Sequence, residues 1–228
     1  MGAQWKHKGR LEGGAKKGAL FTRLSKEIII ACKSGDPSPE ANARLRAALE
    51  NARKNSMPKD TIERAMKKGR GELDEGVIYE TVTYEGFCPH QVPIMVECVT
   101  ENRNRTAQDI RTIFRKGQLG AVAWMYDRRG LIEATHPKGA DAEEAAIEAG
   151  AQDVSVSEDG VEFICDAPDL DAVSRALQGM GWVISTMELG WVPKNRVSLE
   201  GDALADVQAF LELLDDCDDV QRIYTALA

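Results

Sequence analysis

The fold class of this 228-residue chain is decided by residues 131–189, LIEATHPKGADAEEAAIEAGAQDVSVSEDGVEFICDAPDLDAVSRALQGMGWVISTMEL. Short runs with the two-residue period of strands alternate there with longer runs that have the period of helices. The predicted elements are a strand over 131–134, a helix over 141–149, strands over 153–156 and 161–165, a helix over 169–179 and a strand over 182–188. That order, β-α-β-β-α-β, is the order of a ferredoxin-like unit.

The sequence on both sides of this stretch predicts the parts of a second, similar unit. Before it, the sequence predicts strands over 77–84, 93–99 and 121–126, and a helix over 107–116. After it, the sequence predicts a strand over 189–192, a helix over 202–214 and a strand over 220–224. We therefore expect a discontinuous α+β domain, residues 72–130 and 190–228, into which residues 131–189 are inserted as a ferredoxin-like α+β domain.

The first 71 residues have a different composition and a helical period. They predict a basic domain of three helices, preceded by a mobile, glycine-containing arm, and the Gly-rich stretch 69–76 marks its boundary. The helices are predicted to begin near Leu20 and end at Gly35, to begin at the cap Ser38 with Pro39, and to cover 58–68. Lys26 and Lys33 are expected on the outer face of the first helix.

The formal net charge of -8 conceals an uneven distribution. Residues 1–70 contain 17 Lys and Arg against 7 Asp and Glu, a net charge of +10, whereas the remaining residues contain 12 against 30, a net charge of -18. A basic segment attached to an acidic body is typical of a protein in which one part binds a polyanion. The alternative is that the basic segment docks on the protein's own acidic body.

Several functional classes are disfavoured by what the sequence lacks. It has no apolar run of about 18 residues and no secretory leader, so we expect a cytoplasmic protein without a membrane partner. It has no phosphate-binding loop, no nucleotide-binding fingerprint and no nucleophile elbow. We therefore expect that the protein is not an enzyme and that it binds no cofactor and no small-molecule substrate. Five scattered cysteines suit buried free thiols.

Two clusters that resemble metal sites have simpler interpretations. Cys88, His90 and Cys98 match no closed tetrahedral spacing, so we predict no metal there. The acidic run DDCDD, residues 215–219, lacks the alternating ligands and central glycine of a calcium loop, and we expect a solvated turn.

The candidate nucleic-acid-binding residues of the N-terminal segment are basic side chains with one aromatic ring. Cationic side chains that neutralise phosphates release counterions, which gives an affinity that falls steeply with salt. The candidates are Trp5, Lys6, Lys8, Arg10, Lys16 and Lys17 in the arm, and Arg23, Lys26, Arg44, Arg46, Arg53, Lys54, Lys67 and Lys68 on the helices.

A second candidate site is the stretch TENRNRT, residues 100–106. Thr106 and Asp109 fit a capping box, so a helix is expected to begin there, with Arg103 and Arg105 at its N-terminus. Such an end favours an anion, and Asn102 and Asn104 complete a candidate phosphate site that Arg111 and Arg115 extend along the helix. The alternative is that these arginines pair with nearby carboxylates.

These segments together resemble the YebC/PmpR family, which includes the mitochondrial translational activator of cytochrome c oxidase. The resemblance is carried, over nearly the whole chain, by the helical stretch 20–71, YEGF, TENRNRTAQDIRTIFRK, AVAWMYDRRG and LLDDCDDVQRIY. It implies three domains, the last inserted into the middle one, and no enzymatic activity. Carried over by position, the family's basic N-terminal pattern falls on Trp5, Lys6, His7 and Lys8 and its NRNR motif on 102–105.

The chain departs from the family pattern at three places. The family's glycine-rich turn after tyrosine-glutamate-glycine is here FCPHQ, residues 87–91, its glycine-rich loop after the NRNR helix is shortened to KGQLG, residues 116–120, and its N-terminal arm is compressed.

Three functional hypotheses remain from the sequence. The resemblance implies a DNA-binding transcriptional regulator, although no helix-turn-helix with base-reading side chains is evident. The alternative that the resemblance implies is a ribosome-associated translation factor that binds ribosomal RNA and assists synthesis of proline-rich stretches. Contacts to phosphate do not distinguish the two nucleic acids. The third is a protein–protein adaptor that uses the ferredoxin-like sheets. We predict a nucleic-acid-binding regulator of gene expression without catalysis, and place transcription first.

Overall fold

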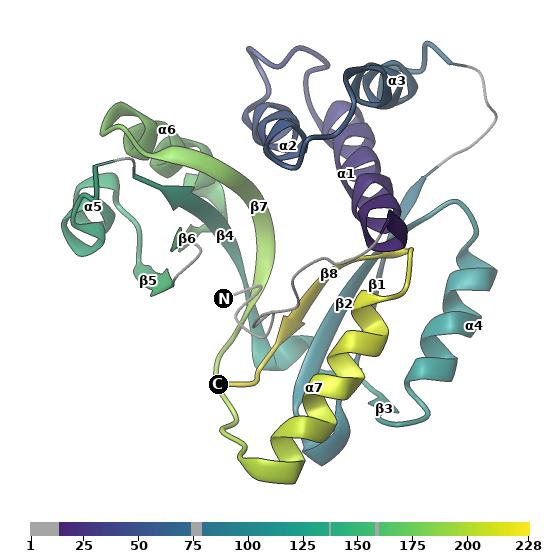
Figure 1. Cartoon of the computed structure of the whole chain (residues 1–228). Coiled ribbons are helices and arrows are strands. Elements are labelled where there is room, and N and C mark those ends of the chain that lie inside the picture. Colours follow the sequence, from purple (N-terminus) through teal and green to yellow (C-terminus); the bar gives the residue numbers. More distant parts are fainter. Residues whose placement is uncertain (1–13, 74–78, 137, 158–159) are drawn as a thin grey trace. The chain divides into compact units, whose positions relative to one another are not determined.

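The computed structural model describes residues 14–73, 79–136, 138–157 and 160–228, with side chains from residue 18 onward. Within these ranges the chain is α+β, with seven α-helices and two four-stranded sheets (Figure 1). The predicted fold class, an N-terminal group of three helices followed by two ferredoxin-like α/β domains of which one is inserted in the other, is confirmed. None of the described helices has the length and apolar character that crossing a membrane requires.

The chain divides into two compact units. The first contains the start of α1, residues 76–127 and residues 191–228, and the second contains residues 24–75 and 128–190. Strands β4 and β7 each run from one unit into the other. The finer division predicted from the sequence, with boundaries after residues 71, 130 and 189, stays a prediction.

The three N-terminal helices are α1 (Gly14–Ser34), α2 (Ala43–Lys54) and α3 (Lys59–Gly69). Helix α1 begins earlier than predicted from the sequence. From Leu24 onward these helices share an apolar interior made by Ile28, Cys32, Leu45, Leu49 and Ile62, each less than one tenth exposed. Gly69 allows α3 to approach α1 closely, since a Cβ atom at residue 69 would lie 2.6 Å from Cβ of Cys32.

The predicted start of α2 at Ser38 is wrong, because Asn42 is the cap. The Asn42 Oδ1 atom accepts a hydrogen bond from the Leu45 N–H at 2.9 Å, and its Nδ2 donates to the Ala31 and Asp36 carbonyls, both at 2.8 Å. A side chain that satisfies an orphan helix donor and two carbonyls at once outcompetes the serine. Ser38 instead lies in a turn, where its N–H donates to Asp36 Oδ1.

The sheet of the first unit has the strand order β3-β1-β2-β8. Its members are β1 (Glu80–Phe87), β2 (Pro93–Thr100), β3 (Gln118–Leu119) and β8 (Val220–Thr225), and all three pairings are antiparallel. Every residue of the central strand β2 is buried.

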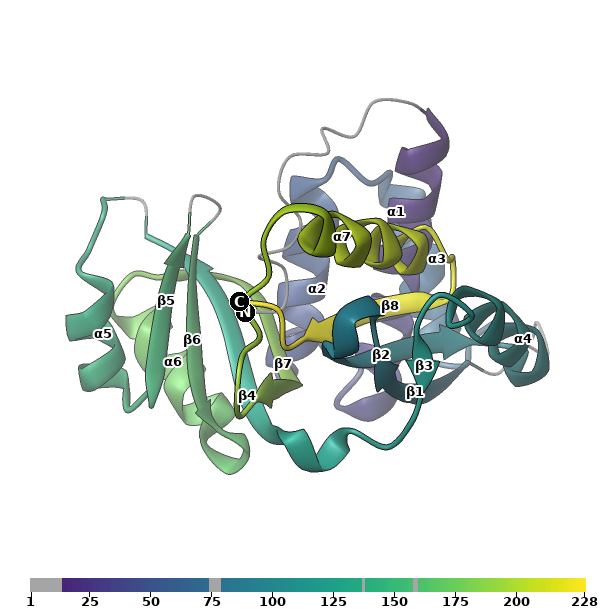
Figure 2. The ribbon, with the colours of Figure 1, turned by 90° about the horizontal axis from the view of Figure 1, so that it is seen from below.

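Helices α4 (Arg103–Ile113) and α7 (Gly201–Asp215) lie against this sheet (Figures 1 and 2). The rings of Phe114, which follows α4, and Phe210 of α7 pack edge to face, with centroids 5.2 Å apart. Gly86 of β1 makes room for this packing, because a Cβ atom there would lie 2.6 Å from the Phe114 ring. Even-numbered residues of β1 therefore face α4.

The strand predicted over 121–126 is wrong. Residues Ala123–Met125 form a 3-10 turn, and the strand β4 (Tyr126–Thr135) begins only after it. The Val122 and Ala123 N–H groups both donate to Glu85 Oε2 at 2.8 Å, so a side chain rather than a strand ladder satisfies this backbone.

The second unit contains the ferredoxin-like order that residues 131–189 predict. Its elements are β4, α5 (Ala142–Ala149), β5 (Asp153–Ser157), β6 (Gly160–Asp166), α6 (Leu170–Gly179) and β7 (Val183–Pro193). The strand order is β5-β6-β4-β7, so β6 separates the two strands that α5 joins, as a split βαβ unit requires. Its apolar core includes Ile132, Phe163, Leu177 and Trp182. The strand predicted over 189–192 is the end of β7.

Candidate nucleic-acid interface

The N-terminus of α4 is capped by Asn102, not by Thr106. The Asn102 Oδ1 atom accepts a hydrogen bond from the Arg105 N–H at 3.1 Å, and the helix begins at Arg103. The capping box predicted from Thr106 and Asp109 is therefore wrong, because the asparagine before the two arginines is an equally good cap. Arg103 and Arg105 belong to the first helical turn.

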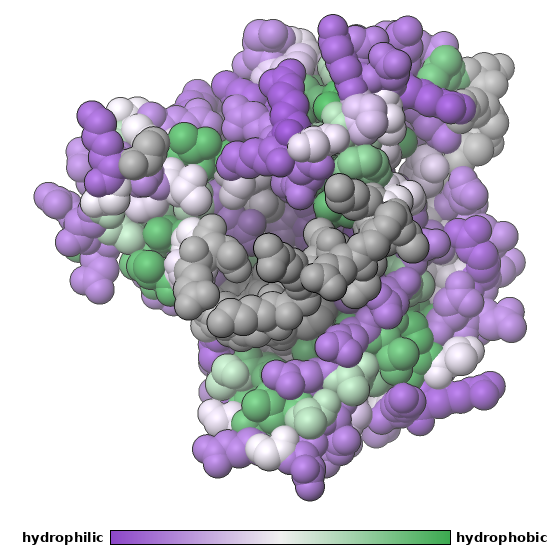
Figure 3. All heavy atoms as spheres, viewed as in Figure 1, coloured by the Kyte–Doolittle hydropathy of each residue, from purple (hydrophilic) through white to green (hydrophobic). Residues whose placement is uncertain are grey.

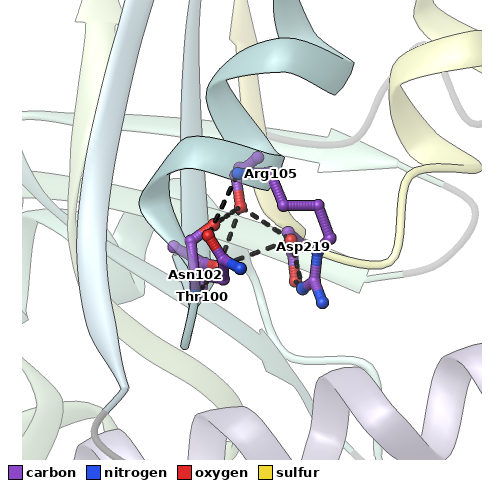
Figure 4. Close-up of polar contacts among 5 residues, drawn as sticks. Thr100, Asn102, Arg105 and Asp219 are labelled. Atoms are coloured by element: carbon purple, nitrogen blue, oxygen red, sulfur yellow. Dashed lines mark hydrogen bonds and ion pairs between the residues drawn. The ribbon is translucent and has the colours of Figure 1, made fainter.

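Asp219 joins this helix end to the start of β8 (Figure 4). One nitrogen of Arg105, Nη2, lies 2.8 Å from Asp219 Oδ2 and 3.1 Å from Oδ1. The hydroxyl of Thr106 donates to Oδ2 at 2.7 Å, and that of Thr100 lies 3.4 Å from the same oxygen. The Asn102 N–H donates to Thr100 Oγ1 at 2.9 Å. The buried carboxylate therefore holds the whole turn in place.

Asp219 corrects the expectation of a solvated turn at residues 215–219. Only 4% of Asp219 is exposed, and Asp215 of the same run pairs with Arg23 at 2.7 Å. The side-chain hydrogen bonds and the charge of Asp219 raise the pKa of the Arg105 guanidinium. The arginine is thus charged and already paired with an anion of the same chain, as the alternative of ion pairing anticipates.

Arg103, Arg111 and Arg115 lie along α4 and just beyond its end with their side chains exposed. Arg103 makes only a long contact, 3.7 Å, to Glu80, and both side chains are more than half exposed. Among the described residues, Arg111 and Arg115 have no ion pair. Arg111 lies roughly 80° around the helix from Arg103, and Arg115 follows the last turn, so the three guanidiniums are spread over part of the circumference. Figure 3 shows a mostly hydrophilic surface in the region of α4.

Tyr84 of β1 lies beside two of these arginines. It faces α4, as Gly86 does, and it is half-buried. Burial and the neighbouring Cys98 raise the pKa of the Tyr84 hydroxyl, whereas the charges of Arg103 and Arg111 lower it in part. The arrangement combines exposed cations with an aromatic ring, and phosphate and sugar contacts commonly use these groups.

The candidate residues on the N-terminal helices are in different environments. Arg53, Lys54 and Lys67 are exposed, as an interface requires, and Lys68 is partly exposed. Arg44 donates to Glu27 Oε1 at 3.0 Å, and Arg23 pairs with Asp215. Arg46 is partly buried. Lys26 is buried, so the expectation that it lies on the outer face is wrong, whereas Lys33 is exposed as predicted.

The predicted arm residues Trp5, Lys6, His7, Lys8 and Arg10 lie outside the described residues. Lys16 and Lys17 belong to α1, but their side chains are also outside the described part.

No group of three or more metal-binding side chains occurs among the residues that the structure describes. Of the three side chains compared with a zinc site, Cys88 and Cys98 are buried, whereas His90 is exposed and its Nε2 lies 2.9 Å from Asp206 Oδ2 of α7.

The sequence pointed to the arginines of α4 but not to the residues that position them. Asp219 is far from the NRNR motif in the sequence, and Thr100 lies just before the motif. A pattern of charges in the sequence cannot distinguish a buried carboxylate from a solvated one. The signal available for Asp219 was its place directly before the buried strand 220–224. Tyr84 was missed because it appeared only as a strand residue.

Comparison with known families and proteins covers nearly the whole chain. Residues 3–72 match the family described as the TACO1/YebC protein N-terminal domain, and residues 79–227 match the TACO1/YebC second and third domain. Proteins from Pseudomonas syringae pv. tomato and Bdellovibrio bacteriovorus, both named probable transcriptional regulatory proteins, are 51% and 47% identical over the full length of both chains.

More distant relatives show the same extent of similarity. A probable transcriptional regulatory protein of Dictyoglomus turgidum is 46% identical over 97% of this chain and 92% of its own. The crystal structure of a conserved hypothetical protein from Aquifex aeolicus superposes with a TM-score of 0.86 and 40% identity, over 99% of this chain and 96% of that one.

Proposed function

The chain belongs to the TACO1/YebC family, and on that premise we propose that it is a cytoplasmic, nucleic-acid-binding regulator of gene expression that acts without catalysis. The names of its relatives favour a regulator of transcription, so we place binding to DNA first. The five cysteines are all free thiols, which suits a reducing compartment.

The observation that carries the proposal is the group of exposed arginines on α4. Arg103, Arg111 and Arg115 are all exposed on or just after the helix, and Arg103 and Arg111 are close enough to Tyr84 to influence its hydroxyl. The unit that contains α4 is otherwise rich in carboxylates, yet Arg103 makes only a long, exposed contact to Glu80, and Arg111 and Arg115 have no ion pair among the described residues. Guanidiniums recognise phosphates through bidentate hydrogen bonds, so exposed arginines are suited to contact a nucleic-acid backbone.

Arg105 has a different part in the proposed interface. Its guanidinium is held by Asp219, so it orders the first turn of α4 and leaves phosphate contacts mainly to Arg103, Arg111 and Arg115. The exposed Arg53, Lys54 and Lys67 belong to the second unit and are separate candidates for phosphate contacts. Such an interface binds the backbone rather than base edges, and it predicts affinity for many sequences.

The proposal is tested by salt-dependent binding of the full chain to duplex DNA. We expect the double variant R103A/R111A to bind duplex DNA more weakly than the wild type. The slope of log K against log salt should also decrease in magnitude by about 2, since each phosphate contact contributes about 0.9 to that slope. The matched control is R175A/K138A, which removes the same charge from exposed positions of the second unit. Equal effects of the two variants would reject the α4 interface.

The kind of nucleic acid is identified by crosslinking in cells, followed by recovery and sequencing of what is bound to the wild type and to R103A/R111A. Discrete promoter DNA that is lost in the variant supports the transcriptional assignment. Ribosomal RNA lost in the same way would replace DNA by the ribosome as the target. Recovery of neither nucleic acid would overturn the proposal and leave the basic residues as a surface for protein contacts.

A further inference from the structure

The turn between β3 and β4 carries an exposed aromatic ring. Trp124 is 71% exposed, although tryptophan is on average one of the more buried residues. Its backbone belongs to the 3-10 turn Ala123–Met125, which the side chain of Glu85 holds through two backbone N–H groups. The indole N–H donates to the Ala121 carbonyl at 3.3 Å. The ring is therefore presented to solvent from a braced turn, so little conformational entropy would be lost on stacking.

A basic segment is fixed beside this turn. The Lys194 N–H donates to the Met125 carbonyl, and Lys194 Nζ donates to the Trp124 carbonyl, both at 2.9 Å. Lys194 Nζ also lies 3.6 Å from Asp127, an exposed and therefore weak ion pair. Asn195 and Arg196 follow directly and are exposed. Residues 189–199 contain these two cations and no carboxylate, within a part of the chain whose net charge is strongly negative.

We propose that Trp124, Lys194 and Arg196 bind an unpaired nucleotide. The indole stacks on the base, and the two cations contact the neighbouring phosphates. A single exposed tryptophan needs no explanation by itself, but an aromatic platform joined to a basic segment is the arrangement that binds single strands. Stacking of a base on an aromatic ring contributes about 1–3 kcal/mol and tolerates any base.

This inference rests on the proposed function only in that the protein must bind nucleic acid. It adds a second surface, distinct from α4, and it specifies that the strand bound there is unpaired. A base inside a duplex is stacked on its neighbours and cannot cover the indole ring. Single-stranded DNA and RNA offer the same chemistry, so the experiment includes both.

The experiment measures the binding of the full chain to fluorescent 12-nucleotide DNA and RNA strands, to the same strands without bases, and to duplex DNA. We expect W124A to bind the base-bearing strands about 5- to 160-fold more weakly than the wild type, as loss of one stacked base predicts. W124A should bind the abasic strands and the duplex with the same affinity as the wild type. W124F should retain most of the affinity, because phenylalanine can also stack.

Two further variants separate stacking from charge and from folding. R196A should weaken binding to base-bearing and abasic strands alike and lower the salt slope by about 0.7. I147A removes another exposed apolar side chain, 82% exposed, and should leave all affinities unchanged. Urea unfolding of each variant checks that the fold is retained. If W124A loses affinity for only one of the two kinds of single strand, DNA or RNA, that kind is the source of the bound nucleotide.

Three outcomes would overturn the inference. If W124A has wild-type affinity for base-bearing strands, Trp124 serves another partner. If W124A weakens abasic strands equally, the ring contributes no stacking. If the wild type binds the duplex through α4 but no single strand, this inference fails while the proposed function stands, whereas absence of any binding removes both.

Discussion

Arg105 and Asp219 are 114 positions apart in the chain, and a single guanidinium nitrogen lies 2.8 Å and 3.1 Å from the two carboxylate oxygens. The carboxylate is 5% exposed as a side chain and the arginine 49% exposed. The pair thus joins the first turn of α4 to the start of β8. It also supplies an internal anion at a helix end that would otherwise attract one from outside.

Removal of either partner of this pair should destabilise the protein. We expect R105A to lower the free energy of unfolding by about 2 kcal/mol, since it takes the guanidinium away from the buried carboxylate. D219A should cost about 3 kcal/mol, because the hydroxyls of Thr100 and Thr106 lose their acceptor as well. Urea unfolding measures both values, and R103A, which removes an exposed arginine of the same turn, should stay within about 0.5 kcal/mol of the wild type. A destabilisation by R103A as large as that by R105A would contradict the structural role of Asp219.

Asn42 should contribute more to stability than any other polar residue between α1 and α2. Its side chain makes three hydrogen bonds and is 8% exposed, so N42A should lower the free energy of unfolding by about 2–3 kcal/mol. S38A tests the alternative cap and should change stability by less than about 0.5 kcal/mol. Thermal unfolding followed by circular dichroism distinguishes the two variants. The opposite ranking would restore Ser38 as the cap.

Gln91 occupies a backbone conformation that favours glycine. His90 and Gln91 have φ angles of 59° and 61°, at the site where the family pattern has a glycine-rich turn. Gln91 is exposed, so Q91G should raise the free energy of unfolding by about 0.5–1 kcal/mol by relieving the left-handed strain. Q91V should lower it by more than about 1 kcal/mol, because a β-branched side chain tolerates positive φ least. Equal stabilities in a urea titration would show that the turn relaxes at no cost.

Cys88 should make the protein less stable at alkaline pH. Burial raises the pKa of its thiol from 9.0 to about 12, so the folded protein holds the proton more tightly than the unfolded chain. The corresponding stability is fully present below pH 9 and declines as pH rises towards 12, by at most about 1.4 kcal/mol per pH unit. C88A removes this dependence. Urea unfolding at pH 8 and pH 11 should therefore show the wild type losing about 2.6 kcal/mol more than C88A, and parallel losses would refute the contribution.

The sequence predicted the elements whose periodicity is long or strongly apolar. The helices over 141–149 and 169–179 and the strands over 93–99 and 161–165 occur within a few residues of their predicted ends, because buried faces impose their period on the sequence. The predictions that failed concern local hydrogen bonds. The caps at Asn42 and Asn102, and the turn at 121–126, depend on side chains that bond backbone groups, and several residues in each stretch had suitable chemistry.

The candidate site was predictable only in part, for a related reason. Arg103, Arg111 and Arg115 are recognisable from their spacing, but whether an arginine is paired depends on residues that are distant in sequence. Arg105 looks equivalent to Arg103 in TENRNRT, and only the position of Asp219 separates them. Trp124 and Lys194 are likewise 70 residues apart, and the lysine Nζ donates to the Trp124 backbone carbonyl in a contact that no sequence pattern encodes.

The ion pair between Arg105 and Asp219 has a consequence during synthesis of the chain, because its two partners are made at different times. A ribosome makes α4 long before it makes β8, so a growing or truncated chain presents the first turn of α4 without its carboxylate. In that interval Arg105 is free to attract any phosphate. Only when residue 219 has been made does the turn acquire its own anion, so the first turn of α4 should be less ordered in incomplete chains than in finished ones.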